Sequence, residues 1–145
     1  MFQFVQKQVA DAMSAPPVSI RDDATLADAE AVLEQHGFNG CPVVDAEGRL
    51  VGIVTGLDLL RAFRVTPDAL VPQYRRIMAF PVADHMCQAP LTVTPDTPLT
   101  RVLQRMLDLG NTGFPVLVDG RLVGVVTRRD VLRELRLSTS SEAPQ

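Results

Sequence analysis

Residues 48–58 read GRLVGIVTGLD, and residues 120–130 read GRLVGVVTRRD. The two stretches differ only at positions 53, 56 and 57 and at the equivalent positions 72 residues later. Each contains an apolar, β-branched run that ends in Thr-x-x-Asp, a pattern typical of a strand that leads directly into a helix. A strand-to-helix corner that is used twice therefore decides the fold.

The duplication extends upstream of both corners. VADAM at 9–13 returns as VADHM at 82–86, and GCPVV at 40–44 returns as GFPVL at 113–117. The spacing is 73 residues before the turn and 72 after it, because the first copy has one more residue in its turn. These ordered matches indicate one unit of roughly 55 residues used twice, and a unit of that size buries its apolar face poorly when alone.

The first helix of each copy has recognisable ends. In the second copy Thr97 is the expected N-cap, Pro98 occupies the first helical position and Gly110 is the expected left-handed C-cap. The first copy repeats this plan between Thr25 and Gly37. Apolar residues at helical spacing predict one buried face in the second copy, formed by Leu99, Val102, Leu103, Met106 and Leu107.

Strands complete each copy. Short strands are expected at 17–20 and 91–93, ahead of the helices. A hairpin follows each helix and turns at 46–48 or at Asp119-Gly120, which is a strong two-residue turn signal. A second helix then begins near the aspartate of the corner. The predicted order is β-α-β-β-α, twice, which places the chain in the mixed α/β (α+β) class.

The complete pattern resembles a tandem pair of cystathionine β-synthase-type (CBS) domains, a Bateman module, here as a stand-alone CBS protein. The resemblance rests on the corners at 52–58 and 124–130 and on the strands at 40–44 and 113–117. It implies two repeats that pack through their sheets with pseudo-twofold symmetry, and a homodimer of such pairs. We expect the following organisation: a lead-in at 1–8, a first CBS domain at 9–63, a linker at 64–81, a second CBS domain at 82–135 and a polar, disordered tail at 136–145.

The segment Thr127-Arg128-Arg129-Asp130 offers groups for a nucleoside monophosphate. A helix N-terminus favours an anion, guanidinium groups and a hydroxyl donate to phosphate, and a carboxylate accepts from a ribose diol. The resemblance to CBS domains that bind adenosine ligands implies that the threonine contacts the phosphate and the aspartate contacts the ribose. Thr55 and Asp58 match this motif in the first copy. The same spacing is also that of a capping box, which alone would explain both residues.

The resemblance further implies an apolar slot for the adenine between the repeats, in an arrangement that crosses them. Thr127 and Asp130 would share a ligand with the first repeat's slot residues, and Thr55 and Asp58 with the second's. The resemblance assigns these residues to the two slots: Phe38, Asn39, Gly40, Asn111, Thr112 and Gly113, closed by Met13, Val18, Met86 and Leu91. The glycines allow close approach to a flat ring, or else serve a loop with unusual dihedral angles. The methionines have core packing as their alternative role.

The two copies differ where charge matters. Gly56 and Leu57 stand in the first copy where the second has Arg128 and Arg129. We therefore predict two unequal sites, with the Asp130 site favouring ligands that carry phosphate.

Nothing in the sequence predicts catalysis. His36 and His85 lie near no nucleophile motif, and Cys41 and Cys87 have no metal or redox spacing and are expected to be buried. The expected function is a non-catalytic, energy-sensing regulatory module. It binds AMP, ADP, ATP or S-adenosylmethionine reversibly, has no prosthetic group or metal, and signals by conformational change to a protein in trans. The alternative is a structural or dimerisation module without a ligand. The sequence leaves open which ligand binds, whether both sites are occupied, and whether the dimer is parallel or antiparallel.

Composition limits the classes of binding partner that are expected. The chain of 145 residues has a formal net charge of −3 and is 46% hydrophobic. An acidic balance disfavours nucleic acid and anionic membranes as general partners. The N-terminus lacks the pattern of a signal peptide, so a cytoplasmic location is expected.

Overall fold

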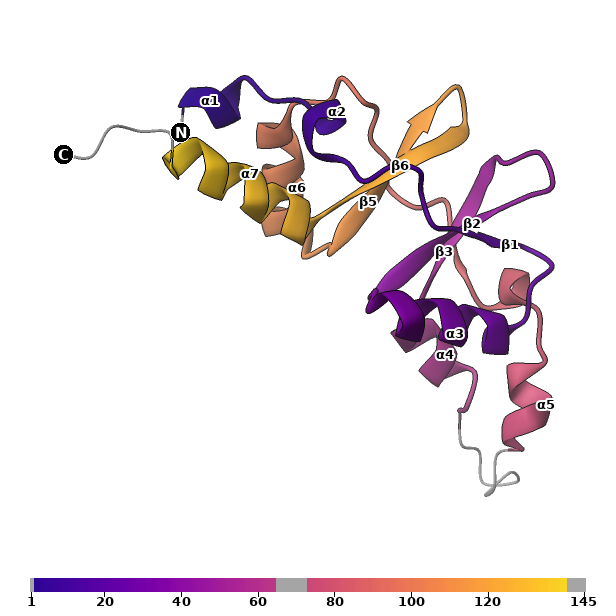
Figure 1. Cartoon of the computed structure of the whole chain (residues 1–145). Coiled ribbons are helices and arrows are strands. Elements are labelled where there is room, and N and C mark those ends of the chain that lie inside the picture. The colour runs from indigo at the N-terminus through magenta and orange to yellow at the C-terminus, as the bar shows by residue number, and fades with distance from the viewer. Residues whose placement is uncertain (1, 65–72, 141–145) are drawn as a thin grey trace. The chain divides into compact units, whose positions relative to one another are not determined.

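The computed structural model describes residues 2–64 and 73–140, and the chain forms two compact units (Figure 1). Unit 1 combines residues 1–17 with 91–145, whereas unit 2 is the continuous stretch 18–90. The mixed α/β class is confirmed. Residues 65–72 of the predicted linker and residues 141–145 of the predicted tail lie outside the described residues.

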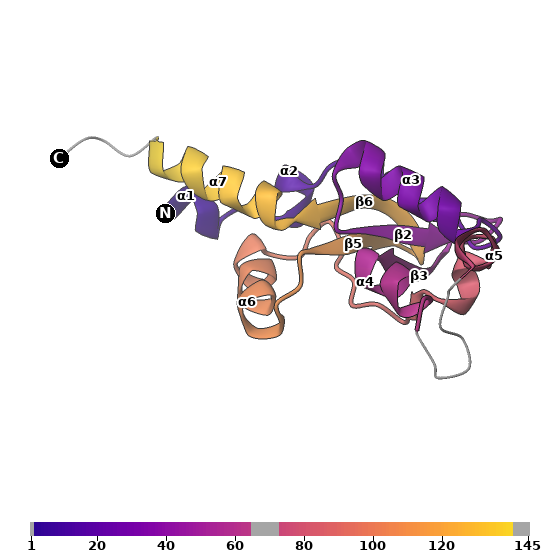
Figure 2. The ribbon, with the colours of Figure 1, turned by 90° about the horizontal axis from the view of Figure 1, so that it is seen from below.

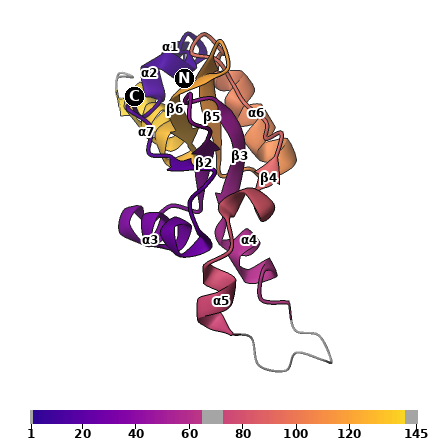
Figure 3. The same ribbon diagram turned by 90° about the vertical axis from the view of Figure 1, so that its right-hand side faces the viewer.

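Unit 2 is built on a four-stranded sheet in the order β1-β2-β3-β4. Strand β1 is parallel to β2, and the other neighbours are antiparallel. Helices α3 and α4 lie together on the hairpin of β2 and β3, and β4 lies beside β3 (Figure 3). The elements are β1 (Ile20–Arg21), α3 (Leu26–His36), β2 (Gly40–Val44), β3 (Leu50–Thr55), α4 (Gly56–Arg61), α5 (Tyr74–Met78), the 3-10 helix η1 (Val82–Asp84) and β4 (Cys87–Gln88).

Unit 1 repeats this plan around the hairpin of β5 and β6. Its helix α1 lies beside α7 (Figure 2). Two isolated bridges, Val93 with Val116 and Ser14 with Val125, take the places that β1 and β4 have in unit 2. The strand expected at 91–93 is therefore a single bridge. The elements are α1 (Phe2–Val5), α2 (Val9–Ala12), α6 (Leu99–Leu109), β5 (Gly113–Val118), β6 (Arg121–Thr127) and α7 (Arg128–Ser140).

Local signals predicted most of the turns and helix ends. Asp119 and Gly120 have φ of 52° and 79°, as a tight hairpin turn requires, and Gly37 and Gly110 are left-handed C-caps with φ of 64° and 74°. The prediction for the start of α6 is wrong, because Pro98 and not the preceding threonine is the N-cap. The hydroxyl of that threonine instead accepts a hydrogen bond from the backbone N–H of Thr94 in the preceding turn, at 3.1 Å.

Each unit has its own apolar core, and two predictions about burial are wrong. Leu107 was expected on the buried face of α6 but is 72% exposed. Cys87 was expected to be buried but is exposed on β4, whereas Cys41 is fully buried in unit 2. In addition, α7 continues to residue 140 with Ser138 buried, so residues 136–140 of the predicted tail are helical.

The edge of each hairpin is completed by a segment from the other repeat. We call residues 9–14 and 82–88 the leading segments. In unit 1, Ser14 and Val125 exchange two backbone hydrogen bonds of 2.9 and 3.1 Å. In unit 2, β4 pairs with β3 in the equivalent position. The repeats along the sequence and the compact units in space thus have different limits.

A glycine on each hairpin lets the leading segment approach. A Cβ at Gly124 would lie 2.9 Å from both Met13 Sδ and the Ser14 carbonyl oxygen. A Cβ at Gly52 would lie 2.6 Å from Met86 Sδ. Such distances are too short for any real side chain, so the repeated pairing of a leading-segment methionine with a strand glycine is a packing requirement.

We predict that Gly124→Ala lowers the free energy of unfolding by about 1–3 kcal/mol, because the added methyl overpacks the contact with Met13 and a backbone oxygen. Gly56→Ala is the matched control, since no atom lies within 4 Å of a Cβ at that position. Urea denaturation followed by circular dichroism measures both. Equal stability of the two variants would contradict the packing requirement.

The two cysteines should differ in reactivity. Burial raises the pKa of the Cys41 thiol to about 11, so almost no thiolate forms there at pH 8, and the side chain is closed to solvent. We expect one thiol, Cys87, to react rapidly with an aromatic disulfide reagent at pH 8, and Cys41 to react only after urea is added. Rapid reaction of both thiols in the folded protein would contradict this assignment.

Candidate functional site

The predicted corner of unit 1 forms where β6 passes directly into α7. The Asp130 carboxylate accepts hydrogen bonds through Oδ2 from the Thr127 backbone N–H at 2.9 Å and from the Thr127 hydroxyl at 3.1 Å. The Asp130 N–H in turn donates to Thr127 Oγ1 at 3.4 Å. This reciprocal pair holds an aspartate that is only 4% exposed at the positive end of a 13-residue helix.

Unit 2 has the same corner between β3 and α4. Asp58 Oδ2 accepts from the Thr55 N–H at 2.8 Å and from the Thr55 hydroxyl at 2.9 Å. The capping box that the sequence allows is therefore present in both copies. The box does not decide between a structural and a ligand-binding role, because it occupies mainly one oxygen of each carboxylate.

The second oxygen of each aspartate faces an arginine that the sequence analysis did not include. Asp130 Oδ1 lies 3.3 Å from Arg133 Nη1, and Asp58 Oδ1 lies 3.7 Å from Arg61 Nη1. The signal was available in the sequence, because Asp-x-x-Arg occurs in both copies with the spacing of neighbours on one helix face.

Arg128, a predicted phosphate ligand, contacts backbone carbonyls in this structure. Its Nη2 donates to the Gly110 oxygen at 2.6 Å and its Nε to the Asn111 oxygen at 3.0 Å, at the end of α6. A cation is favourable there because the last carbonyls of a helix carry partial negative charge. Arg129 is exposed on the next position of α7. A phosphate contact by Arg128 stays a prediction, for which the guanidinium has further N–H donors beyond the two used here.

The loop before each hairpin lies against the start of the following helix. The Arg128 N–H donates to the Thr112 oxygen at 3.0 Å, and the Gly56 N–H donates to the Asn39 oxygen at 3.4 Å. The structure therefore brings 111–113 together with the corner of unit 1, and 38–40 together with the corner of unit 2.

The glycines of these loops are extended residues, so the alternative of unusual dihedral angles is wrong for them. Gly40 and Gly113 begin β2 and β5, and neither has a positive φ. A Cβ at Gly113 would lie 3.1 Å from the Val126 oxygen on the paired strand. Close strand pairing thus accounts for this glycine independently of a ligand.

The remaining slot residues differ in exposure. Met13 and Met86 are half-buried against the hairpin glycines, Val18 is half-buried and Leu91 is exposed. Phe38 is 40% exposed and its ring stacks on the His36 ring, with the ring centroids 4.9 Å apart. Their predicted place beside a base stays a prediction.

Unit 2 has a shallow hollow of about 490 Å³ beside its corner. Predicted slot residues contribute to it, and two carboxylates from α3 also line it. The negative charge of Glu30 and Glu34 opposes a phosphate at this corner. The lining residues are Glu30, Leu33, Glu34, Gly37, Phe38, Asn39, Gly56 and Leu59.

Comparison with known proteins identifies the family. The CBS domain model matches residues 9–65 and 82–137. The chain belongs to the CBS domain family. It is 30% identical over 134 residues to an A-adding tRNA nucleotidyltransferase of Aquifex aeolicus, covering 92% of this chain and 15% of that enzyme. The chain spans only 14–22% of the length of the first three curated relatives, so each match concerns a small part of an enzyme.

Two solved CBS pairs share the fold over almost their whole length. CBSX2 of Arabidopsis thaliana in complex with AMP has a TM-score of 0.78 and 27% identity, covering 92% of this chain and 98% of that one. The CBS domain pair of protein MJ0100, in complex with 5′-methylthioadenosine and S-adenosyl-L-methionine, has a TM-score of 0.74 and 28% identity, covering 91% and 98%.

Two classes of feature are absent from the described parts of this CBS pair. Residues 2–64 and 73–140 contain no helix long and apolar enough to cross a membrane. Within the same ranges no cluster of His, Cys, Asp and Glu has the geometry of a metal site.

We predict that Arg128→Met lowers the free energy of unfolding by about 0.5–1 kcal/mol, because the end of α6 loses its charged donor. Arg129→Met, one residue further on the same exposed turn, is the control and should change stability by less than about 0.5 kcal/mol. Urea denaturation measures both, and equal effects would show that Arg128 does not stabilise the α6 terminus.

Proposed function

We propose that this CBS pair is a non-catalytic regulatory module that binds an adenosine-containing ligand at the Asp130 corner and signals by a change of conformation. AMP, ADP, ATP and S-adenosylmethionine are the candidate ligands. The observation that carries the proposal is the Asp130 carboxylate, which is buried at the start of α7 beside a threonine hydroxyl. The AMP and S-adenosyl-L-methionine complexes of two similar CBS pairs support the ligand class.

The chemistry of the corner fits both ends of a nucleotide. The carboxylate can accept hydrogen bonds from the ribose diol. The start of α7 and the exposed Arg129 guanidinium can donate to a phosphate while the Thr127 hydroxyl keeps its hydrogen bond to Asp130. The slot for the base, to which the resemblance assigns residues of both repeats, is part of the proposal.

We also propose that the two corners are unequal. In unit 2 the positions of the two arginines are occupied by Gly56 and Leu57, and the adjacent hollow carries two carboxylates. A phosphate at the start of α4 therefore lacks the two cations that the start of α7 offers, and the two carboxylates repel it. The Asp58 corner should be weaker, or should select a less anionic adenosine compound.

The second candidate is a structural or dimerisation module without a ligand. It is favoured by the capping boxes, which satisfy Thr55 and Thr127 without any ligand. Under either candidate we propose a homodimer of CBS pairs in the cytoplasm. Under the regulatory candidate we propose that a protein in trans responds to the change of conformation.

We predict that AMP binds with a dissociation constant on the order of 10 μM, given about −0.3 kcal/mol for each of roughly 23 heavy atoms. Asp130→Asn should weaken binding about tenfold or more, because an ionised acceptor for the diol is lost. Isothermal titration calorimetry with AMP, ADP, ATP and S-adenosylmethionine makes the measurement.

Asp28→Asn is the matched control for this experiment. Asp28 forms the same capping box with Thr25 at the start of α3, away from both corners. The Asp28→Asn variant should be less stable than the unaltered protein but should bind AMP with unchanged affinity. If all four ligands fail to bind, the structural candidate is the better one. If Asp28→Asn and Asp130→Asn weaken AMP binding equally, AMP does not bind through Asp130.

A further inference from the structure

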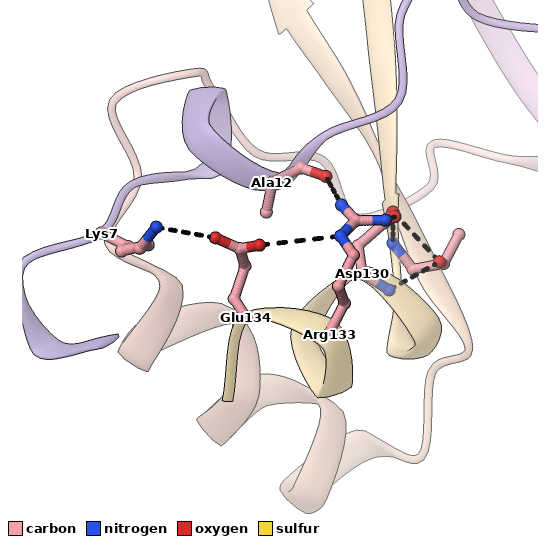
Figure 4. Close-up of polar contacts among 6 residues, drawn as sticks. Lys7, Ala12, Asp130, Arg133 and Glu134 are labelled. Carbon is pink, nitrogen blue, oxygen red and sulfur yellow. Dashed lines mark hydrogen bonds and ion pairs between the residues drawn. The ribbon is translucent and has the colours of Figure 1, made fainter. Parts of the chain in front are cut away.

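A chain of charged contacts in unit 1 links the Asp130 corner to the N-terminal part of the protein (Figure 4). Arg133 contacts Asp130 Oδ1 at 3.3 Å through Nη1, and its Nη2 donates to the Ala12 carbonyl oxygen at 2.9 Å. Its Nε lies 3.6 Å from Glu134 Oε2, and Glu134 Oε1 lies 2.9 Å from Lys7 Nζ. One guanidinium group thus joins the candidate ligand acid to the end of α2.

The two carboxylates in this series of contacts are shielded from solvent, whereas the cations are partly exposed, Arg133 by 41%. The side chains of Glu134 and Asp130 are each only 5% exposed, whereas Lys7 is 33% exposed. A buried carboxylate is unfavourable unless cations or donors compensate it. Glu134 therefore holds both Lys7 and Arg133 in place, and with them the leading segment 9–14.

Unit 2 does not repeat this chain, although it repeats its first link. Arg61 lies in the position of Arg133 and reaches Asp58 at 3.7 Å. Ala62 stands where unit 1 has Glu134, and Phe80 stands where unit 1 has Lys7. The links through Glu134 and Lys7 are therefore specific to unit 1.

The acceptor capacity of Asp130 makes this connection sensitive to a ligand. A carboxylate offers about four lone-pair positions. Three are used, by the N–H and hydroxyl of Thr127 and by Arg133. A ribose diol brings two donors, so one existing contact has to yield, and the Arg133 contact is the longest of the three.

We infer that Arg133 is a positioning residue that couples occupancy of the Asp130 corner to the attachment of the leading segment 9–14. This inference rests on the proposed function, because it needs a ligand at Asp130. When a ribose diol binds to Asp130, Arg133 loses its contact with that carboxylate and its hydrogen bond to the Ala12 oxygen weakens. The leading segment 9–14 then separates more readily from β6. Coupling is reciprocal, so weakening the chain of contacts strengthens ligand binding by the same factor.

The test uses the full chain with AMP as the probe, measuring AMP affinity by calorimetry and amide hydrogen exchange of residues 9–14 by mass spectrometry. The backbone N–H groups of Val9, Ala10 and Ser14 report attachment, because each is hydrogen bonded to the rest of unit 1. In the unaltered protein saturating AMP should accelerate their exchange about fivefold, the lower end of typical coupling.

Variants separate coupling from simple support of the fold. In Arg133→Met the amides of residues 9–14 should exchange rapidly without AMP, and AMP should not accelerate their exchange further. This variant should also bind AMP about fivefold more tightly. Lys7→Met, a partly exposed position, should act in the same direction and serves if Arg133→Met does not fold. Arg136→Met, an exposed position on the same helix α7, is the control and should leave both the AMP affinity and the AMP response of residues 9–14 unchanged.

Each contrary outcome has a distinct meaning. AMP binding without any change in exchange overturns the coupling and leaves the proposed function intact. Weaker AMP binding by Arg133→Met, or a preserved AMP response in that variant, also overturns the coupling, because Arg133 would then only orient Asp130. Absence of AMP binding to the unaltered protein overturns both proposals.

Discussion

The contact between a methionine of one repeat and a bare strand glycine of the other is the constraint on which both units depend. At Gly124 and Gly52 there is no space for a methyl group, because the sulfur of Met13 or Met86 and a backbone oxygen already lie there. This close approach lets the leading segment complete the hairpin edge by hydrogen bonding, which satisfies backbone groups that an open edge would leave unpaired. Without it the outer edge of β3 or β6 would have no paired strand.

The corner residues illustrate that a structural and a functional role can share the same atoms. Thr127 and Asp130 stabilise the start of α7 by their reciprocal hydrogen bonds. The same bonds fix the carboxylate in one orientation, so an approaching ligand meets an acceptor that needs little reorganisation. The capping box and the ligand site are therefore compatible interpretations, and the arginine on the second carboxylate oxygen determines how much acceptor capacity is left.

Features set by neighbours in the sequence were predicted well, and features set by distant residues were not. The Asp119-Gly120 turn and the C-caps at Gly37 and Gly110 follow from local dihedral requirements. The exposure of Cys87 and the exchange of leading segments depend on which strands meet in space, which local patterns do not encode. For the candidate site, the two capping boxes were predictable, whereas the link from Arg133 to Ala12 joins residues 121 positions apart.

The different make-up of the two units has a consequence for how the chain acquires its structure. Unit 2 is one continuous stretch and has all its strands once residue 90 is available, whereas unit 1 needs both its first and its last segments. During synthesis the N-terminal helices must therefore wait for the C-terminal hairpin, while unit 2 can fold in the meantime. In the sequence, unit 2 lies between the two segments of unit 1. Once unit 2 has folded, less flexible chain separates these segments, so less conformational entropy is lost when they join.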